Sequence, residues 1–208
     1  MLFTKEKFDA GMTTRQYIDQ IKVNKQPFVD IYEKVEVAKD VRAQFDELEE
    51  PLKLAVFTAD WCGDALSTTP AILRLADSPD GLSLSVFNRD EEFELTNGFL
   101  PENRAGTVPV FVVYEASMRE VARFIETAKE LVPDIDAMDE MIARELASEG
   151  EEEARRRRGG RRTEFRVQRA RDWGNVILQA FADVVAKGFS LSPSERPALG
   201  GTQWPPEG

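Results

Sequence analysis

The stretch Ala59-Asp60-Trp61-Cys62-Gly63-Asp64-Ala65 carries the only cysteine of the chain, at the junction between two expected elements. It follows a short apolar run, residues 53–59, which we interpret as a buried strand. A helix is expected from about Asp64 to Ala76, and it contains Pro70. Proline inside a helix removes one backbone donor and crowds the preceding turn, so this helix is expected to be kinked.

Further elements are expected on both sides of this junction. Residues 82–88, 110–114 and 120–125 read as strands, and residues 133–148 read as an amphipathic helix. The chain order is therefore strand, helix, strand, short helix, strand, strand, helix. From periodicity alone this order indicates an α/β protein.

A second stretch, Gly106-Thr107-Val108-Pro109-Val110-Phe111, opens the strand expected at 110–114. A Trp-Cys-Gly turn after a strand, a helix with an internal proline and a later Val-Pro step together resemble the thioredoxin family. The resemblance covers roughly residues 50–130, extending to 149. It implies a thioredoxin-like fold, in which helices flank a central mixed sheet, and a cis Val108–Pro109 bond against the turn.

The same resemblance assigns the candidate site. It implies that Cys62 is the catalytic residue. It also implies that the substrate groove is shaped by the residues around the turn and the Val-Pro step: Trp61, Gly63, Asp64, Thr107, Val108 and Pro109.

The turn departs from the family pattern in three ways. The family normally reads Cys-x-x-Cys, whereas Ala65 stands at the second cysteine position here. Asp64 stands where the family often has proline, and Val56 stands where it commonly buries an acid. A helix N-terminus favours the thiolate, but a neighbouring carboxylate disfavours it. The departures argue against efficient disulfide reduction of the dithiol kind.

Two functions stay open at this stage. In the first, the protein serves cell redox homeostasis in the cytoplasm as a monothiol redox or thiol-handling factor that uses Cys62. Its substrate would be a protein or a small thiol, and an external thiol such as glutathione would complete the cycle. In the second, the protein is a non-catalytic interaction module that binds through the cis-proline groove or the C-terminal helix, and Cys62 is only a small apolar residue.

The composition of the chain argues against several kinds of partner, metal site and catalytic group. The 208-residue chain has a net charge of −11 and no histidine. The acidic balance argues against nucleic acid and anionic membranes as partners. One cysteine and no histidine exclude the usual zinc sites and histidine-based triads, so we expect no metal and no resident cofactor. We see no signal peptide and no apolar run long enough to span a bilayer, which makes a cytoplasmic protein the default.

We divide the chain by composition as follows: 1–50, an N-terminal helical extension; 51–149, the thioredoxin-like domain; 150–171, a charged Arg-rich linker; 172–189, an amphipathic C-terminal helix; and 190–208, a disordered tail.

The charged segments have simple interpretations. The arginine tract reads as a solvated hinge or linker, with binding of nucleic acid or an acidic partner as the alternative. Its three glutamates fall four residues before arginines, a spacing that supports a solvated helix. The apolar face of residues 173–185 is expected to dock on its own domain or on a second copy, and otherwise to bind a protein partner. Asp90, Glu91, Glu92 and Glu94 are expected to form a solvated loop.

Overall fold

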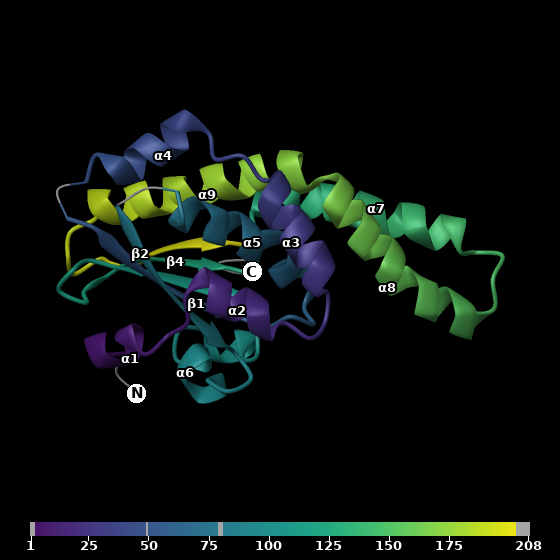
Figure 1. Cartoon of the computed structure of the whole chain (residues 1–208), viewed down its shortest axis with the longest axis horizontal. Helices are drawn as coiled ribbons and strands as arrows, with labels where there is room; N and C mark the ends of the chain where they lie inside the picture. The colour runs from purple at the N-terminus through teal and green to yellow at the C-terminus, as the bar shows by residue number, and fades with distance from the viewer. Residues whose placement is uncertain (1–2, 49, 79–80, 203–208) are drawn as a thin grey trace.

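The structure, a computed structural model, describes residues 3–48, 50–78 and 81–202. Its strands form one five-stranded sheet in the order β2-β1-β3-β4-β5 (Figure 1). Strand β1 pairs in parallel with β2 and antiparallel with β3, so the sheet is mixed. The strands are β1 (Leu52–Thr58), β2 (Leu82–Asn88), β3 (Val110–Tyr114), β4 (Glu120–Ile125) and β5 (Ala198–Gly201).

Both faces of this sheet are covered, and alternate residues of β1, β2 and β3 enter two different cores. On one face, Val56, Val86 and Phe111 pack under helices. On that side lie α3 (Lys25–Lys34), α4 (Lys39–Asp46), α5 (Gly63–Ala76) and α9 (Ala170–Ser190), as Figure 1 shows.

The other face has a core rich in aromatic rings. Phe57 and Phe87 stack with their ring centroids 5.2 Å apart, and Phe3 meets both rings edge-on. Helices α1 (Lys5–Asp9) and α6 (Phe93–Asn97) lie on this side of the sheet. The N-terminal segment is therefore anchored by its aromatic residues.

The N-terminal extension also covers an edge of the sheet. Met12 and Val86 exchange backbone hydrogen bonds beside β2, just before α2 (Thr14–Gln20). The N-cap of α2 is Thr13, whose hydroxyl accepts from the backbone of Gln16 while the Gln16 side chain accepts from the backbone of Thr13. This capping box satisfies two donors at the helix start.

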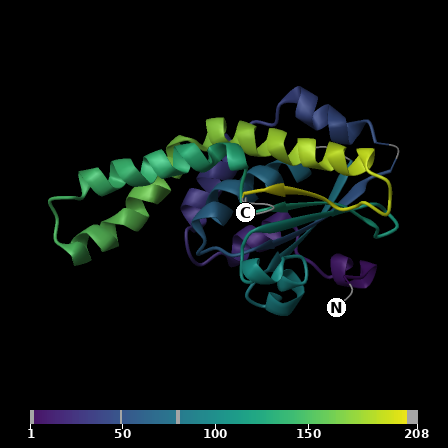
Figure 2. The same ribbon diagram turned by 180° about the vertical axis from the view of Figure 1, so that it is seen from behind.

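Residues 150–171, predicted as a linker, are helical over most of their length. Helix α8 (Glu151–Gln168) turns back along α7 (Val132–Glu145), and the pair projects from the sheet as a hairpin (Figure 2). Arg162 binds Asp139 through two hydrogen bonds of 2.6 and 2.5 Å. The tract is therefore the helix that its Glu-to-Arg spacing supports, but it packs against α7 and is not a free linker.

Helix α9 docks on its own chain. Trp173, Ile177 and Phe181 are buried, and the helix packs against α5, β4 and β5. This outcome is one of the alternatives that the amphipathic pattern left open.

The predicted disorder after residue 190 was wrong for residues 198–201. They form β5, which pairs in parallel with β4. Composition suggested disorder, but the unpaired edge of β4 offers backbone partners that a local pattern does not reveal. Residues 203–208 of the predicted tail lie outside the described residues. Two short 3₁₀ helices complete the described elements: η1 (Glu102–Arg104) and η2 (Lys129–Leu131).

Candidate functional site

The Cys62 turn joins the end of β1 to the start of α5. Cys62 is the N-cap of α5, and its carbonyl accepts the first helical hydrogen bond from Leu66 at 3.0 Å. Its thiol donates to the carbonyl of Val108 at 3.4 Å. The turn and the Val-Pro step, 46 residues apart in sequence, therefore meet at the sulfur atom.

The Val108–Pro109 peptide bond is cis, and its loop is held by residues from several elements. Arg104 donates to the Thr107 hydroxyl at 3.4 Å and binds Glu126 at 2.7 Å. Thr202, beyond β5, also donates to Glu126. The C-terminal extension thus contributes to the support of the loop that faces Cys62.

Cys62 is partly buried. Burial raises the pKa of its thiol, and the negative charge of Asp64 raises it further, whereas the backbone N–H of Ala65 lowers it. A raised pKa means a smaller thiolate fraction at neutral pH than for an ordinary cysteine. The start of α5 favours the thiolate, but this effect on the pKa is smaller than the combined effect of burial, Asp64 and Glu126.

The position of the family's second thiol and the position of its buried acid are both occupied by buried apolar residues here. Ala65 and Val56 are buried, with 1% and 0% of their surfaces exposed. Between strand and helix, the hydroxyls of Thr58 and Thr69 pair at 2.8 Å. Among these described neighbours, no group could resolve a mixed disulfide on Cys62 or deprotonate a second thiol.

Trp61 is the exposed side chain of the turn. Its surface is 51% exposed, and its indole N–H donates to Asp90 at 2.8 Å. The buried guanidinium of Arg89 lies 5.1 Å from the Trp61 ring centroid and 5.5 Å from that of Phe93. Asp90, predicted to belong to a solvated loop, is exposed but also orients the tryptophan.

The N-terminal extension fixes the start of the turn. The Asp60 carboxylate accepts from the backbone N–H groups of Lys22 and Val23, at 2.8 and 3.0 Å. The side chain of Asn24 donates to the Asp60 carbonyl at 3.1 Å. The connection between α2 and α3 therefore positions the turn from outside the central domain.

Arg166 of α8 covers the other side of the turn. Only 7% of its surface is exposed, and its Nη2 lies 3.6 Å from Oδ1 of Asp64. A Cβ atom added to Gly63 would lie 3.1 Å from the same nitrogen, so the glycine lets the guanidinium lie against the backbone. Burial lowers the pKa of Arg166, and the charge of Asp64 opposes that shift.

Sequence reasoning identified the residues of the turn and the Val-Pro loop, and the structure brings them together. It missed the supporting side chains. For Arg166 a signal existed, because stepping back along the apolar face of α9 from Trp173 by helical spacing reaches Ala170, Arg166 and Arg162. The missed residues that contact the site or hold it are Lys22, Val23, Asn24, Asp60, Arg89, Asp90, Arg104, Glu126, Arg166 and Thr202.

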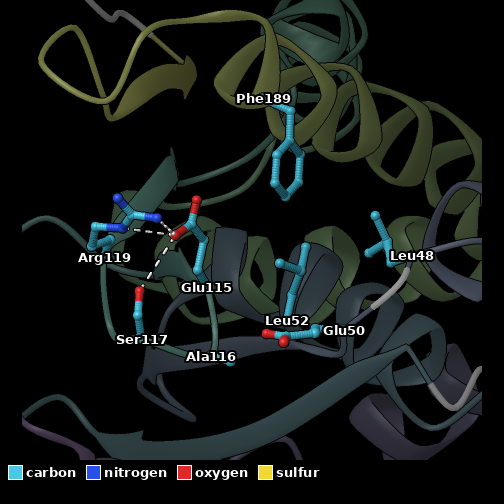
Figure 3. A pocket seen from close by; sticks show the side chains of 8 residues that line it. All are labelled: Leu48, Glu50, Leu52, Glu115, Ala116, Ser117, Arg119 and Phe189. Atoms are coloured by element: carbon cyan, nitrogen blue, oxygen red, sulfur yellow. Dashed lines mark hydrogen bonds and ion pairs between the residues drawn. The ribbon is translucent and has the colours of Figure 1, made fainter.

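A separate pocket of about 370 Å³ lies at the opposite end of β1, near Leu52 (Figure 3). Glu50 and Glu115 are its carboxylates, and Glu115 binds Arg119 at 2.7 Å and Arg196 at 2.5 Å. Because this pocket is remote from the thiol, we do not assign the site there.

No group of three or more His, Cys, Asp or Glu side chains suited to a metal ion occurs in the described part of the chain. Over the same residues, every helix is too short or too polar to cross a membrane.

A family model described as thioredoxin matches residues 11–139. A Pseudomonas aeruginosa protein of unknown function aligns with a TM-score of 0.56 at 14% identity, over 86% of this chain and 99% of that one. An HIV epitope-scaffold aligns with a TM-score of 0.53 at 15% identity, over the same shares. Mitochondrial thioredoxin 3 from Saccharomyces cerevisiae aligns at 0.30 and 16% identity, over 46% of this chain and 86% of that one. No functionally curated protein matches the sequence.

The mixed sheet with helices on both faces is a thioredoxin-like fold. The chain belongs to the thioredoxin family, since the family model matches more than half of it. The match begins at residue 11, so it includes α2–α4, whereas α8, α9 and β5 lie beyond its end.

Proposed function

We propose that this protein is a monothiol thiol-handling factor of the reducing cytoplasm, in which Cys62 exchanges with a disulfide substrate and forms a mixed disulfide with one half of it. The observation that carries the proposal is the position of the Cys62 sulfur. It lies at the N-terminus of α5, 3.4 Å from the Val108 carbonyl of the cis-proline loop, while Ala65 replaces a second thiol.

The reaction is a thiol–disulfide exchange in two steps. The Cys62 thiolate attacks one sulfur of a disulfide; a bond from Cys62 to that sulfur forms, and the other half leaves as a thiolate. An external thiolate then attacks the bound sulfur, and Cys62 leaves as a thiolate. Cys62 is oxidised in the first step and reduced in the second, so no other oxidant or reductant is needed.

The environment of Cys62 favours a long-lived intermediate. Burial and Asp64 raise the pKa of the thiol, and a thiolate of high pKa is a slow leaving group. The buried Ala65 offers no internal attack on the mixed disulfide. We therefore expect the protein to hold a thiol rather than to turn over rapidly.

Intact-protein mass spectrometry tests this proposal. The folded chain is incubated with bis(2-hydroxyethyl) disulfide at a series of pH values, beside a Cys62→Ser variant. We expect one adduct on the natural chain, formed faster as pH rises beyond about 8.5, and released only when an external thiol is added. Absence of an adduct from the folded chain across this pH range would overturn the proposal.

A second candidate is a non-catalytic interaction module. It is favoured by the neighbouring exposed rings of Trp61 and Phe93, 51% and 41% exposed, beside the Arg89 guanidinium. Aromatic and arginine side chains are enriched where proteins bind one another. In that case Cys62→Ser would leave partner binding unchanged, whereas a Trp61→Ala substitution would weaken it.

A further inference from the structure

Arg166 presents a buried donor without an acceptor. Its side chain is 8% exposed, and its Nε atom has no hydrogen-bond partner among the described residues. Its nearest carboxylate, on Asp64, is at 3.6 Å, which is longer than a charge-assisted hydrogen bond. Arg166 therefore carries a buried positive charge that its neighbouring carboxylate compensates only at a distance.

The space beside Arg166 is a pocket of about 410 Å³ between the Cys62 turn and α8. This volume is within the usual range for small-molecule sites. Trp61 and Gly63 line it from the turn, and Arg162 and Arg166 from α8. The N-terminus of α5, where backbone N–H groups favour negative charge, adjoins the same space.

Two glycines of α8 line the pocket without a side chain. Gly159 and Gly160 line the pocket inside the helix, and a Cβ atom on either would meet nothing within 4 Å. Glycine weakens a helix interior by about 1 kcal/mol relative to alanine. Packing within the described residues therefore does not require these glycines, and the lack of a side chain at both positions leaves this wall of the pocket open.

The ionisable side chains that line this pocket are all positively charged, within the described residues. Both of these side chains are arginines. Their carboxylate partners, Asp139 for Arg162 and Asp64 for Arg166, are outside the lining. By contrast, a pocket of about 620 Å³ beside Asp60 is mainly acidic: its ionisable lining residues, apart from Tyr17, are Lys22 and the four carboxylates Asp19, Asp60, Asp90 and Glu91. The basic pocket is thus the place for a negative group.

We propose that this pocket binds the carboxylate of a small organic thiol or disulfide and thereby selects anionic substrates for Cys62. The choice of a thiol-bearing ligand rests on the proposed function, whereas the carboxylate follows from the lining. In the exchange, the bond forms from Cys62 to the sulfur of the carboxylate-bearing half. The other half leaves as a thiolate and takes a proton from water.

The first experiment compares three small disulfides on the folded chain: dithiodipropionate, which is anionic; bis(2-hydroxyethyl) disulfide, which is neutral; and cystamine, which is cationic. Each rate of adduct formation is divided by the rate with the urea-unfolded chain, which removes intrinsic reactivity. We expect a preference of about tenfold for the anionic over the neutral disulfide, reduced by added salt.

The variants separate the pocket from general charge. Gly160→Leu fills the pocket from an open helix position, and Arg162→Gln removes one lining cation. Both should abolish the preference. Arg156→Gln makes the same charge change on α8 at a 75% exposed side chain, ten positions from Arg166, and should retain it.

The second experiment removes thiol chemistry. S-methylglutathione, which bears carboxylates but cannot exchange, is titrated into Cys62→Ser protein and followed by NMR. Saturable binding that Gly160→Leu weakens about tenfold supports the site.

The two experiments separate the possible failures. Reaction of Cys62 without a charge preference, together with no saturable binding, overturns this inference and leaves the proposed function. Binding without any reaction of Cys62 keeps the site and overturns the proposed function.

Discussion

Helices α8 and α9 are consecutive in the chain, separated only by Arg169, yet they are stabilised in different ways. Helix α9 buries apolar side chains such as Ile177 and Phe181 against the sheet. Helix α8 is mostly exposed and is held to α7 by ion pairs, and the side chain it buries is Arg166. The difference indicates that α9 serves the fold, whereas α8 serves the candidate site.

The largest expected effect comes from the core of α9. Phe181 is 1% exposed and lies within 6.5 Å of the rings of Phe45, Phe111 and Phe124. We expect Phe181→Ala to lower the free energy of unfolding by about 3–5 kcal/mol, because it leaves a cavity. Urea titration followed by circular dichroism measures this.

Phe189 provides the matched control on the same helix. It is 39% exposed and contacts Arg196 at 5.4 Å from the ring centroid. Phe189→Ala should lower the free energy of unfolding by about 1 kcal/mol or less. Equal losses at the two positions would contradict the assignment of α9 as a core helix.

Replacing glycine by alanine should change the free energy of unfolding in opposite directions in the two helices. Replacing both Gly159 and Gly160 of α8 by alanine should raise the free energy of unfolding by about 1–2 kcal/mol, because both sites are open and alanine favours helix. In α9, a Cβ atom on Gly188 would lie 2.4 Å from the Val121 carbonyl oxygen, so Gly188→Ala should destabilise the protein. Thermal denaturation distinguishes the signs; stabilisation by Gly188→Ala would show that the helix and strand separate easily.

The same contrast explains what the sequence could predict. Strands β2, β3 and β4 have the predicted bounds, because their apolar pattern is local. The turn and the Val-Pro loop were identified from motifs. The helical hairpin and β5 depend on partners distant in sequence, Asp139 for Arg162 and β4 for residues 198–201. Composition alone therefore suggested a linker and a disordered tail.

The site was predicted in part for the same reason. Cys62 and Val108 belong to motifs, and their contact follows from the fold. Arg166 comes from a segment whose arginines are mostly exposed, and nothing local distinguishes it from Arg156 or Arg158 except its spacing from Trp173. Its role becomes visible only when α8 is placed over the turn.

A smaller loss of stability is expected when the ion pair between α7 and α8 is broken. Asp139 binds Arg162 with both carboxylate oxygens at a partly exposed position. Asp139→Asn should lower the free energy of unfolding by about 1 kcal/mol or less. Because Arg162 is then free, S-methylglutathione should bind more tightly in the same titration. Weaker binding would mean that Asp139 holds Arg162 in the orientation that the ligand needs.

The smallest expected effect is a change in the reactivity of the thiol, at Asp64. Its carboxylate is one of the causes that raise the pKa of Cys62, so Asp64→Asn should lower that pKa. The thiolate fraction at neutral pH then increases, and alkylation of Cys62 by iodoacetamide becomes faster. Well above the pKa both proteins hold the full thiolate, and their rates should converge.

Asp90→Asn is the matched control for Asp64→Asn. It makes the same change in charge beside Trp61, at a carboxylate that is not among the groups that raise the pKa of Cys62, and it should leave the pH profile of alkylation unchanged. A profile that Asp64→Asn does not move would contradict the electrostatic role of Asp64, and would leave burial and the charge of Glu126 as the causes of the raised pKa. A profile that moves toward lower pH would show that the charge beside Cys62 restrains a thiol which the start of α5 would otherwise activate.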